Sequence, residues 1–394
     1  MDCRSVQLTS AMVTDPSGMT PRALTDLLEF VVDNRGRTCP VTSEGFPLIA
    51  TNCVKPGRRE AVFENVRFVD EATYKNWFRA HPQPGDVLFV CKGSPGRVAV
   101  VPDPVPYCIA QDMVALRADR SVVLPSYLYY RLLAPDVQAG IRSMHVGTLI
   151  PHFKKGDFSR LRFTIHDNLE EQRRIAGVLA SLDDLIEVNR HTLLSCTALR
   201  RALIGDALRG TTKSVPLSQL ATFVNGRNFT KNATGAGRPI IRTPEVRGGP
   251  GSGTVRTDAV AADENIARAG DVLFVWSGSL MVGRWMWEEG LVNQHVFKVI
   301  PKQNYPAWLV FALIEHQLPW FLSLAADKAT TMGHIKREHL DAQVPVPLPD
   351  EIERLDEVIA PLWDESLQCG LEIEQLNRTR NELLPLLMSG RVVA

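Results

Sequence analysis

Two segments of the chain place apolar residues at the seven-residue spacing of helices that pack along one seam. The seam of the first segment, residues 168–210, is carried by Ile175, Val178, Leu182, Leu185, Asn189, Leu199 and Leu203. The seam of the second segment, residues 347–394, is carried by Leu355, Val358, Leu362, Ile373, Leu376 and Leu383. The two segments align at a constant offset of 180 positions, which indicates one rigid element in each. We therefore predict two long helices.

A lone helix of this kind cannot bury its apolar seam. We predict that the two helices pack on each other as an antiparallel coiled coil, and that Asn189, at a core position, helps to fix their register. The alternative is that each helix only covers the domain beside it in the sequence.

The blocks before and between the helices consist of short apolar runs bounded by turn residues, as in strand-rich domains. The phrase GDVLFV occurs at residues 85–90 and again at residues 270–275, and GFPLIAT at residues 45–51 matches GRPIIRT at residues 237–243. The chain is thus an internal repeat. We predict an α+β fold in which two β-rich domains, residues 1–167 and 211–346, are separated by the two helices and related by a pseudo-twofold repeat.

Composition narrows the class of protein only a little. Lys plus Arg balance Asp plus Glu at 44 each, so a nucleic-acid partner has to be sought in local clusters of charge. The seven cysteines are scattered without a C-x-x-C pair, and the first residues lack the pattern of a secretory signal. Residues 307–326 are interrupted by polar residues and Pro319, which predicts a buried helix and a turn rather than a membrane span. These features favour a cytoplasmic protein.

One stretch of the first helix resembles a known family. NLEEQRRIAGVLASLDDLIEVNR at residues 168–190 is closely similar to the start of the central conserved helix in the specificity subunits of type I restriction–modification systems. LLPLLMSG at residues 383–390 is similar to the closing leucine-rich stretch of that family. With the repeated GDVLFV phrase, the resemblance covers nearly the whole chain after residue 22. Two departures are that the second helix lacks a counterpart of Gln172 and that residues 1–22 have no partner in the repeat.

The resemblance implies a sequence-specific DNA-binding subunit that is not itself an enzyme. Each β-rich block would be a target recognition domain that reads one half of a bipartite DNA sequence, and the helices would be the spacer that sets the unread gap. The partners implied are double-stranded DNA, two methyltransferase subunits docked on the helices, and restriction subunits assembled on those. The partners would carry out adenine methylation and restriction, and S-adenosylmethionine, ATP and Mg would be bound by them.

Cationic and polar residues in glycine-bearing loops of both blocks are the candidates for DNA contact. In the first block they are Arg35, Arg37, Arg58, Arg59, Ser94, Arg97, His152, Lys154 and Lys155. In the second block they are Arg227, Asn228, Arg242, Arg247, Ser277, Ser279, Arg284, His334, Lys336 and Arg337. The repeated cationic pairs beside His152 and His334 suggest phosphate clamps that precede short helices. The plainer alternatives are a solvated charged face and glycines that only form hairpins.

Signatures of catalysis are missing from the sequence. It has no phosphate loop, no H-E-x-x-H helix, no G-x-S-x-G elbow and no Asn/Asp-Pro-Pro-Tyr/Phe motif of an adenine methyltransferase. His334 and His339 lack a third ligand nearby, so a metal site is not expected. Two other readings stay open: a coiled-coil scaffold whose β-rich domains bind proteins, and the recognition subunit of a related system with a fused methyltransferase–nuclease partner.

Overall fold

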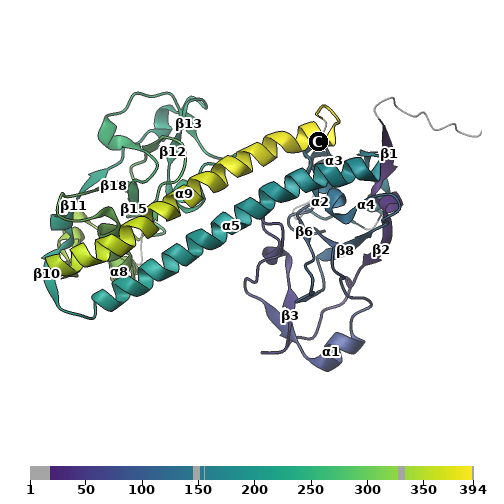
Figure 1. The fold of residues 1–394 in the computed structure, drawn as a ribbon, viewed down its shortest axis with the longest axis horizontal. Helices are drawn as coiled ribbons and strands as arrows, with labels where there is room; N and C mark the ends of the chain where they lie inside the picture. The colour runs from purple at the N-terminus through teal and green to yellow at the C-terminus, as the bar shows by residue number, and fades with distance from the viewer. Residues whose placement is uncertain (1–17, 145–150, 155, 327–332, 393–394) are drawn as a thin grey trace, which may run out of the picture. The chain divides into compact units, whose positions relative to one another are not determined.

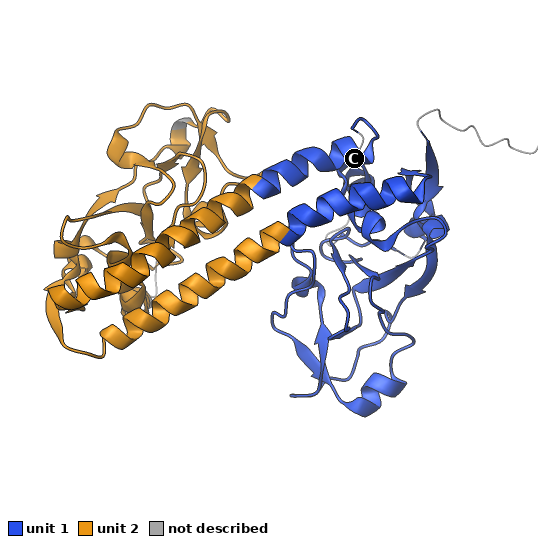
Figure 2. Cartoon of the chain, in the orientation of Figure 1, with its two compact units in different colours: residues 1–184, 376–394 blue, residues 185–375 orange. Residues whose placement is uncertain are grey.

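The computed structural model describes residues 18–144, 151–154, 156–326 and 333–392. Contacts divide the chain into unit 1, residues 1–184 and 376–394, and unit 2, residues 185–375 (Figure 2). Both boundaries fall inside long helices, α5 (Leu169–Ala207) and α9 (Pro349–Met388), so the two predicted helices are confirmed (Figure 1). Each unit therefore contains a β-rich block together with a part of both helices.

Unit 1 is built on an antiparallel sheet with the strand order β2-β8-β5-β6 and a smaller sheet with the order β4-β3-β7. A third pair, β1 with β9, brings the start of the described chain beside the segment that leads into α5. The strands are β1 (Met19–Ala23), β2 (Leu28–Val32), β3 (Phe46–Ile49), β4 (Arg67–Val69), β5 (Val87–Val90), β6 (Val98–Val100), β7 (Cys108–Ile109), β8 (Met113–Ala118) and β9 (Arg162–His166). The helices are η1 (Leu24–Leu27), η2 (Thr51–Cys53), α1 (Glu71–Asn76), α2 (Pro125–Leu133), α3 (Pro135–Ser143) and α4 (Asp157–Arg160).

Unit 2 has an antiparallel sheet with the order β11-β18-β15-β16, a second sheet with the order β13-β12-β17-β14, and the pair β10 with β19. Its strands are β10 (Thr212–Pro216), β11 (Ala221–Asn225), β12 (Arg238–Ile241), β13 (Arg256–Thr257), β14 (Ile266–Ala267), β15 (Val272–Val275), β16 (Met281–Arg284), β17 (Gly290–Val292), β18 (Val296–Pro301) and β19 (Gln343–Pro347). Its helices are α6 (Leu217–Leu220), η3 (Thr230–Asn232), α7 (Thr243–Gly248), η4 (Asp263–Asn265), α8 (Ala307–Ala326) and η5 (Arg337–Asp341).

The repeated GDVLFV phrase forms an inner strand of the main sheet in each unit. In both β5 and β15 all four residues are buried, and each strand pairs with neighbours on both sides. A strand buried on both faces reads as a continuous apolar run, which is the pattern that Val-Leu-Phe-Val shows. The phrase is repeated because each unit needs the same core strand.

The C-terminal end of α9 completes the core of unit 1. Leu384, Leu387 and Met388 belong to the same buried cluster as Ile175 and Leu179 of α5, and this cluster continues into β5 and α2. In unit 2 the roles are exchanged: Ile204, near the end of α5, lies in one cluster with Ile352, Leu355 and Ile359, from the start of α9. The two long helices therefore pack together within each unit.

The structure corrects the predicted seam of these helices. Four of the predicted seam residues are well exposed: Val178 (40%), Leu185 (51%), Leu199 (47%) and Val358 (52%). The buried face instead includes Asp183 and Arg200, two charged residues that a search for apolar periodicity assigns to the surface. Their presence in the seam interrupts the apolar pattern, so the sequence favoured the neighbouring stripe. Asn189 is half-buried rather than in the core.

Residues 307–326 form one continuous helix, α8, whereas the sequence predicts a helix followed by a turn. Pro319 lies inside this helix, which is held on both sides of it by packing, because Leu313 and Phe321 are both fully buried in the core of unit 2. Propensity disfavours an internal proline, and tertiary packing overrides it here. By length and composition alone, residues 307–325 are also apolar enough to cross a membrane. The burial of much of α8 is equally typical of a core helix.

Candidate nucleic-acid interface

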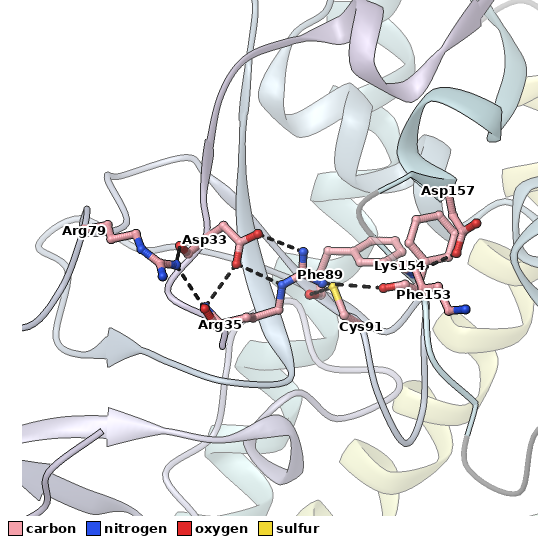
Figure 3. Close-up of polar contacts among 8 residues, drawn as sticks. All are labelled: Asp33, Arg35, Arg79, Phe89, Cys91, Phe153, Lys154 and Asp157. Atoms are coloured by element: carbon pink, nitrogen blue, oxygen red, sulfur yellow. Dashed lines mark hydrogen bonds and ion pairs between the residues drawn. The ribbon is translucent and has the colours of Figure 1, made fainter. Parts of the chain in front are cut away.

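Arg35, predicted to contact DNA, serves instead to order the loop that follows β2 (Figure 3). Its guanidinium group donates to both carboxylate oxygens of Asp33, at 2.9 and 2.8 Å, and Nη1 lies 3.5 Å from the carbonyl oxygen of Phe153. Arg79 donates from Nη1 to the carbonyl oxygens of Asp33 and Arg35, at 2.9 and 3.0 Å. Only 16% of the Arg35 side chain is exposed, so its charge is largely used inside the protein.

Two hydrogen bonds hold the segment that contains His152 and Lys154, one to the chain just after β5 and one to the start of α4 (Figure 3). The amide of Phe153 donates to the carbonyl oxygen of Cys91 at 2.6 Å, and the amide of Lys154 donates to Asp157 Oδ2 at 2.7 Å. Phe153 is fully buried and packs on Phe89, with ring centroids 5.2 Å apart. His152 and Lys154, on either side of it, are exposed. Burial of one aromatic side chain thus presents its two polar neighbours to solvent.

Unit 2 repeats this local arrangement. Ser277 forms a bridge with His334, as Lys92 does with His152 in unit 1. The amide of Ile335 donates to the carbonyl oxygen of Trp276 at 3.1 Å, and the Ile335 side chain is buried.

The polar residues around Ile335 differ in their exposure and in their contacts within the protein. Lys336 is exposed and pairs with Glu338 at 3.2 Å, Arg337 is exposed with Nη2 3.5 Å from the carbonyl oxygen of Phe223, and His334 is half-buried. The short helices expected after the two cationic pairs are present as α4 and η5. Lys155 lies outside the described residues.

Three further arginines of unit 1 are partly engaged. Arg37 is exposed, lies 4.8 Å above the ring of Trp77, and donates to the carbonyl oxygen of that residue at 2.6 Å. Arg59 pairs with Asp184 of α5 at 2.8 Å, which ties its loop to the helix. Arg58 beside it is half-buried. In the loop after β5, Ser94 is half-buried and Arg97 is exposed.

In unit 2 the turn after β11 presents Arg227 and Asn228 to solvent. The turn is held close to the neighbouring chain, because a Cβ atom at Gly226 would come within 2.2 Å of the Asn293 carbonyl oxygen, so only glycine fits. The amide of Arg227 donates to the Val292 carbonyl oxygen at 3.0 Å. This hydrogen bond fixes the backbone from which the exposed Arg227 side chain extends.

Arg242 directly precedes α7 and Arg247 lies in its last turn, and among the described residues only Arg242 of the two is held by an ion pair. Arg242 forms two hydrogen bonds with the carboxylate of buried Glu245, at 3.2 and 2.8 Å, and this contact raises the pKa of Arg242. Arg247 is exposed and has no ion pair or hydrogen bond from its side chain within the described part of the chain. Of the two, Arg247 has the free guanidinium that a phosphate needs.

Arg284 does not lie in a glycine-bearing loop, as the sequence suggests, but is the last residue of β16. Its side chain is 6% exposed and lies 4.0 Å above the ring of Trp363 in α9, with hydrogen bonds to the Trp363 carbonyl oxygen and to Ser366. Burial lowers the pKa of Arg284 to about 10. This guanidinium holds β16 on the helix and is withdrawn from solvent. Ser279, in the loop before β16, is exposed, and Ser277 is half-buried.

The geometry thus separates the candidates into two groups. Arg35, Arg59, Arg242 and Arg284 are engaged within the protein. Arg37, Arg97, His152, Lys154, Arg227, Asn228, Arg247, Ser279, Lys336 and Arg337 are exposed. Sequence composition could not separate them, because the acidic partners Asp33, Asp184 and Glu245 were not recognisable as partners before the fold placed them. Within the described residues, no group of three or more His, Cys, Asp and Glu side chains could hold a metal ion.

Sequence reasoning also missed Arg380, near the C-terminal end of α9. Its guanidinium is brought beside the loops that carry Arg58 and Arg97, so that all three line one cleft of unit 1. The signal that could have found it is the repeat itself, since Arg380 aligns with Arg200 at the offset of 180 positions.

Comparison with known proteins supports this picture. Residues 16–195 match the family described as type I restriction modification DNA specificity domain. A solved structure of a type I restriction–modification system S subunit from M. genitalium shares 15% sequence identity with the chain, with a TM-score of 0.61 over 97% of this chain and 98% of that one. The HsdS subunit from Thermoanaerobacter tengcongensis, at 16% identity over 96% and 98% of the two chains, has a TM-score of 0.39. No curated protein matched the chain.

The likeness to the M. genitalium protein covers both units and both helices, and at this level of identity it concerns the fold. The family match covers most of unit 1 and the first two thirds of α5, which includes the NLEEQRRI segment. Residues 16–195 of the chain are therefore similar to the DNA specificity domain of type I restriction–modification systems, and the fold of the chain is similar to that of an S subunit of such a system.

Proposed function

We propose that this protein recognises a bipartite DNA target, with the β-rich block of unit 1 reading one half and that of unit 2 reading the other. The observation that carries the proposal is that both units expose polar side chains on the same local scaffold: a buried anchor, Phe153 or Ile335, bridged to the loop after the GDVLFV strand. The exposed cations there suit phosphate contacts, while Asn228 and Ser279 suit contacts to base edges.

The two helices act as the spacer between the two recognition domains. The antiparallel coiled coil and the pseudo-twofold repeat belong to this proposal. In support, the start of α5 shares a core with the end of α9 in unit 1, the end of α5 shares one with the start of α9 in unit 2, and the main sheets have corresponding strand orders. A helix pair of constant length would set a constant unread gap.

The partners in this proposal are two methyltransferase subunits, which dock on the helices, and restriction subunits that assemble on them. Exposed apolar side chains on α5 supply a surface for docking: Val178, Leu185, Val188, Leu194 and Leu199. This chain performs no chemistry in the cytoplasmic complex. S-adenosylmethionine, ATP and Mg are bound by the partners, which methylate adenine and cleave DNA.

The test is single-molecule sequencing of methylated adenines in a host that expresses the chain with its cognate methyltransferase subunit. The matched host expresses the methyltransferase alone. We expect a split motif with a constant gap only when the chain is supplied. A complex that co-purifies and methylates no such motif would contradict the proposal.

The exposed cations Lys154 of unit 1 and Arg227 of unit 2 are expected to contribute to DNA affinity without specifying sequence. Lys154→Gln and Arg227→Gln each remove one cation that has no side-chain partner within the described residues. Each should lower the slope of log affinity against log salt by about 0.9, because one fewer counterion is released from the duplex. Fluorescence anisotropy with duplex DNA over a salt series measures the slope.

The control for this measurement is Arg354→Gln, which removes an exposed cation of α9 that pairs with Glu351 at 2.6 Å. Its salt slope should match that of the unmodified chain. If all three variants have the slope of the unmodified chain, Lys154 and Arg227 do not contact DNA.

A further inference from the structure

Three aligned positions of the repeat carry different chemistry in the two units. Tyr130, Asp183 and Arg380 of unit 1 align with Phe311, Trp363 and Arg200 of unit 2. In unit 2 the three form a cluster: Phe311 and Trp363 pack edge to face with ring centroids 5.2 Å apart, and Arg200 lies 4.9 Å above the former and 5.5 Å above the latter. Arg284 covers the indole of Trp363 from β16. The large ring thus fills its site and accommodates two guanidinium groups.

In unit 1 the central residue is an aspartate, which is much smaller than an indole. The Tyr130 hydroxyl donates to Asp183 Oδ2 at 2.8 Å and Arg380 donates to Oδ1 at 2.5 Å. Arg97, just before β6, is exposed. A cleft of about 560 Å³ opens at this place.

The cleft is strongly cationic. The residues that line it include Lys55, Arg58, Arg97 and Arg380, and none of them is an aspartate or a glutamate. Lys55 pairs with Glu64 and Arg380 pairs with Asp183, but the Arg97 side chain has no partner within the part of the chain that the structure describes. The cleft therefore retains uncompensated positive charge beside side-chain amides of Gln138, Asn377 and Asn381, which also line it.

A tyrosine also borders the cleft. Tyr129 is 3% exposed and lines the cleft. Burial raises the pKa of Tyr129, an effect that Asp183 reinforces and the nearby charges of Arg380 and Arg59 oppose. The hydroxyl is thus protonated at neutral pH and available as a donor beside these guanidinium groups.

We propose that this cleft of unit 1 binds a phosphate group, held by Arg97 and Arg380 with Lys55, Arg58 and the Tyr129 hydroxyl. Planar guanidinium groups match phosphate oxygens in pairs, and the amides supply further donors. The volume lies in the range of sites for small molecules, which favours a free phosphorylated ligand. A phosphate of the DNA backbone has the same chemistry and is the second source.

The experiment uses the full-length chain and two probes, inorganic triphosphate and a short duplex DNA. Isothermal titration calorimetry at low salt compares the unmodified chain with Arg97→Gln, Arg97→Lys and the double variant Lys55→Gln with Arg97→Gln. Arg97 is exposed and unpaired, so its replacement should leave the melting temperature unchanged. Arg354→Gln, which removes an exposed cation of α9 in unit 2, is the control.

For a free ligand, triphosphate affinity falls at least tenfold in Arg97→Gln and further in the double variant, recovers partly in Arg97→Lys, and is unchanged in Arg354→Gln. For a DNA phosphate, triphosphate binding is weak throughout, while duplex affinity and its salt slope fall in Arg97→Gln and more in the double variant. Either result supports the site and identifies the molecule that supplies the phosphate group. Triphosphate and duplex affinities that are the same in all the variants, at equal melting temperature, would overturn it.

Discussion

Inserting one heptad into each long helix is expected to lengthen the unread gap of the DNA target by about three base pairs. Seven residues add about 10 Å of helix at 1.5 Å per residue, and duplex DNA rises about 3.4 Å per base pair. The insertions belong between Asp184 and Leu185 in α5 and between Gln375 and Leu376 in α9, where the boundaries of the two units lie. There they interrupt neither of the cores that the helices share within a unit. Seven residues come within about 20° of two full turns, so each helix keeps its buried face.

The gap is measured by mapping methylated adenines in a host that expresses the lengthened chain with its methyltransferase. Both half-sequences should be retained, with only their separation changed. Insertion of the heptad into α5 alone is the control, because it should shift the helices against each other and abolish methylation. A motif with the original gap after the double insertion would contradict the role of the helices as a spacer.

Replacing Asp183 by alanine is expected to destabilise unit 1 by about 3–5 kcal/mol, because it leaves a buried guanidinium without its carboxylate. The side chains of Asp183 and Arg380 are 5% and 13% exposed, and the carboxylate also accepts from the Tyr130 hydroxyl. This cluster joins α2, α5 and α9, so its loss should loosen the C-terminal part of α9 as well. At about 1.4 kcal/mol per factor of ten, exchange of the most protected amides should accelerate at least a hundredfold.

Hydrogen exchange measured by mass spectrometry separates the two units, so that peptides from β5, α2 and the end of α9 should lose protection while peptides from β15 and α8 should not. Asp184→Ala is the matched control: Asp184 is the next residue, its side chain is 69% exposed, and it pairs with Arg59. An exposed pair contributes at most about 1 kcal/mol. Equal losses of protection in the two variants would show that the burial of Asp183 does not determine how much it stabilises unit 1.

Much of the fold could be predicted because it rests on local or repeated patterns. The long helices follow from their unbroken alignment at one offset, and β5 and β15 follow from an apolar run between turn residues. The helix seam could not be placed correctly, because Asp183 and Arg200 lie in it. A charged residue becomes a core residue only when distant elements supply its partners, here Tyr130 and Arg380 in one unit and Phe311 in the other.

The same distinction applies to the candidate interface. The sequence by itself determined the repeat, the kinds of side chain available for phosphate and base contacts, and the family that the chain resembles. Only the tertiary structure decided which arginines are available, since Asp33 neutralises Arg35 and Trp363 covers Arg284. It also decided that Arg97 and Arg380, far apart in the chain, share a cationic cleft. The physical reason is that the free energy of a charge depends on its burial and its partners, and both are set by contacts between residues distant in sequence.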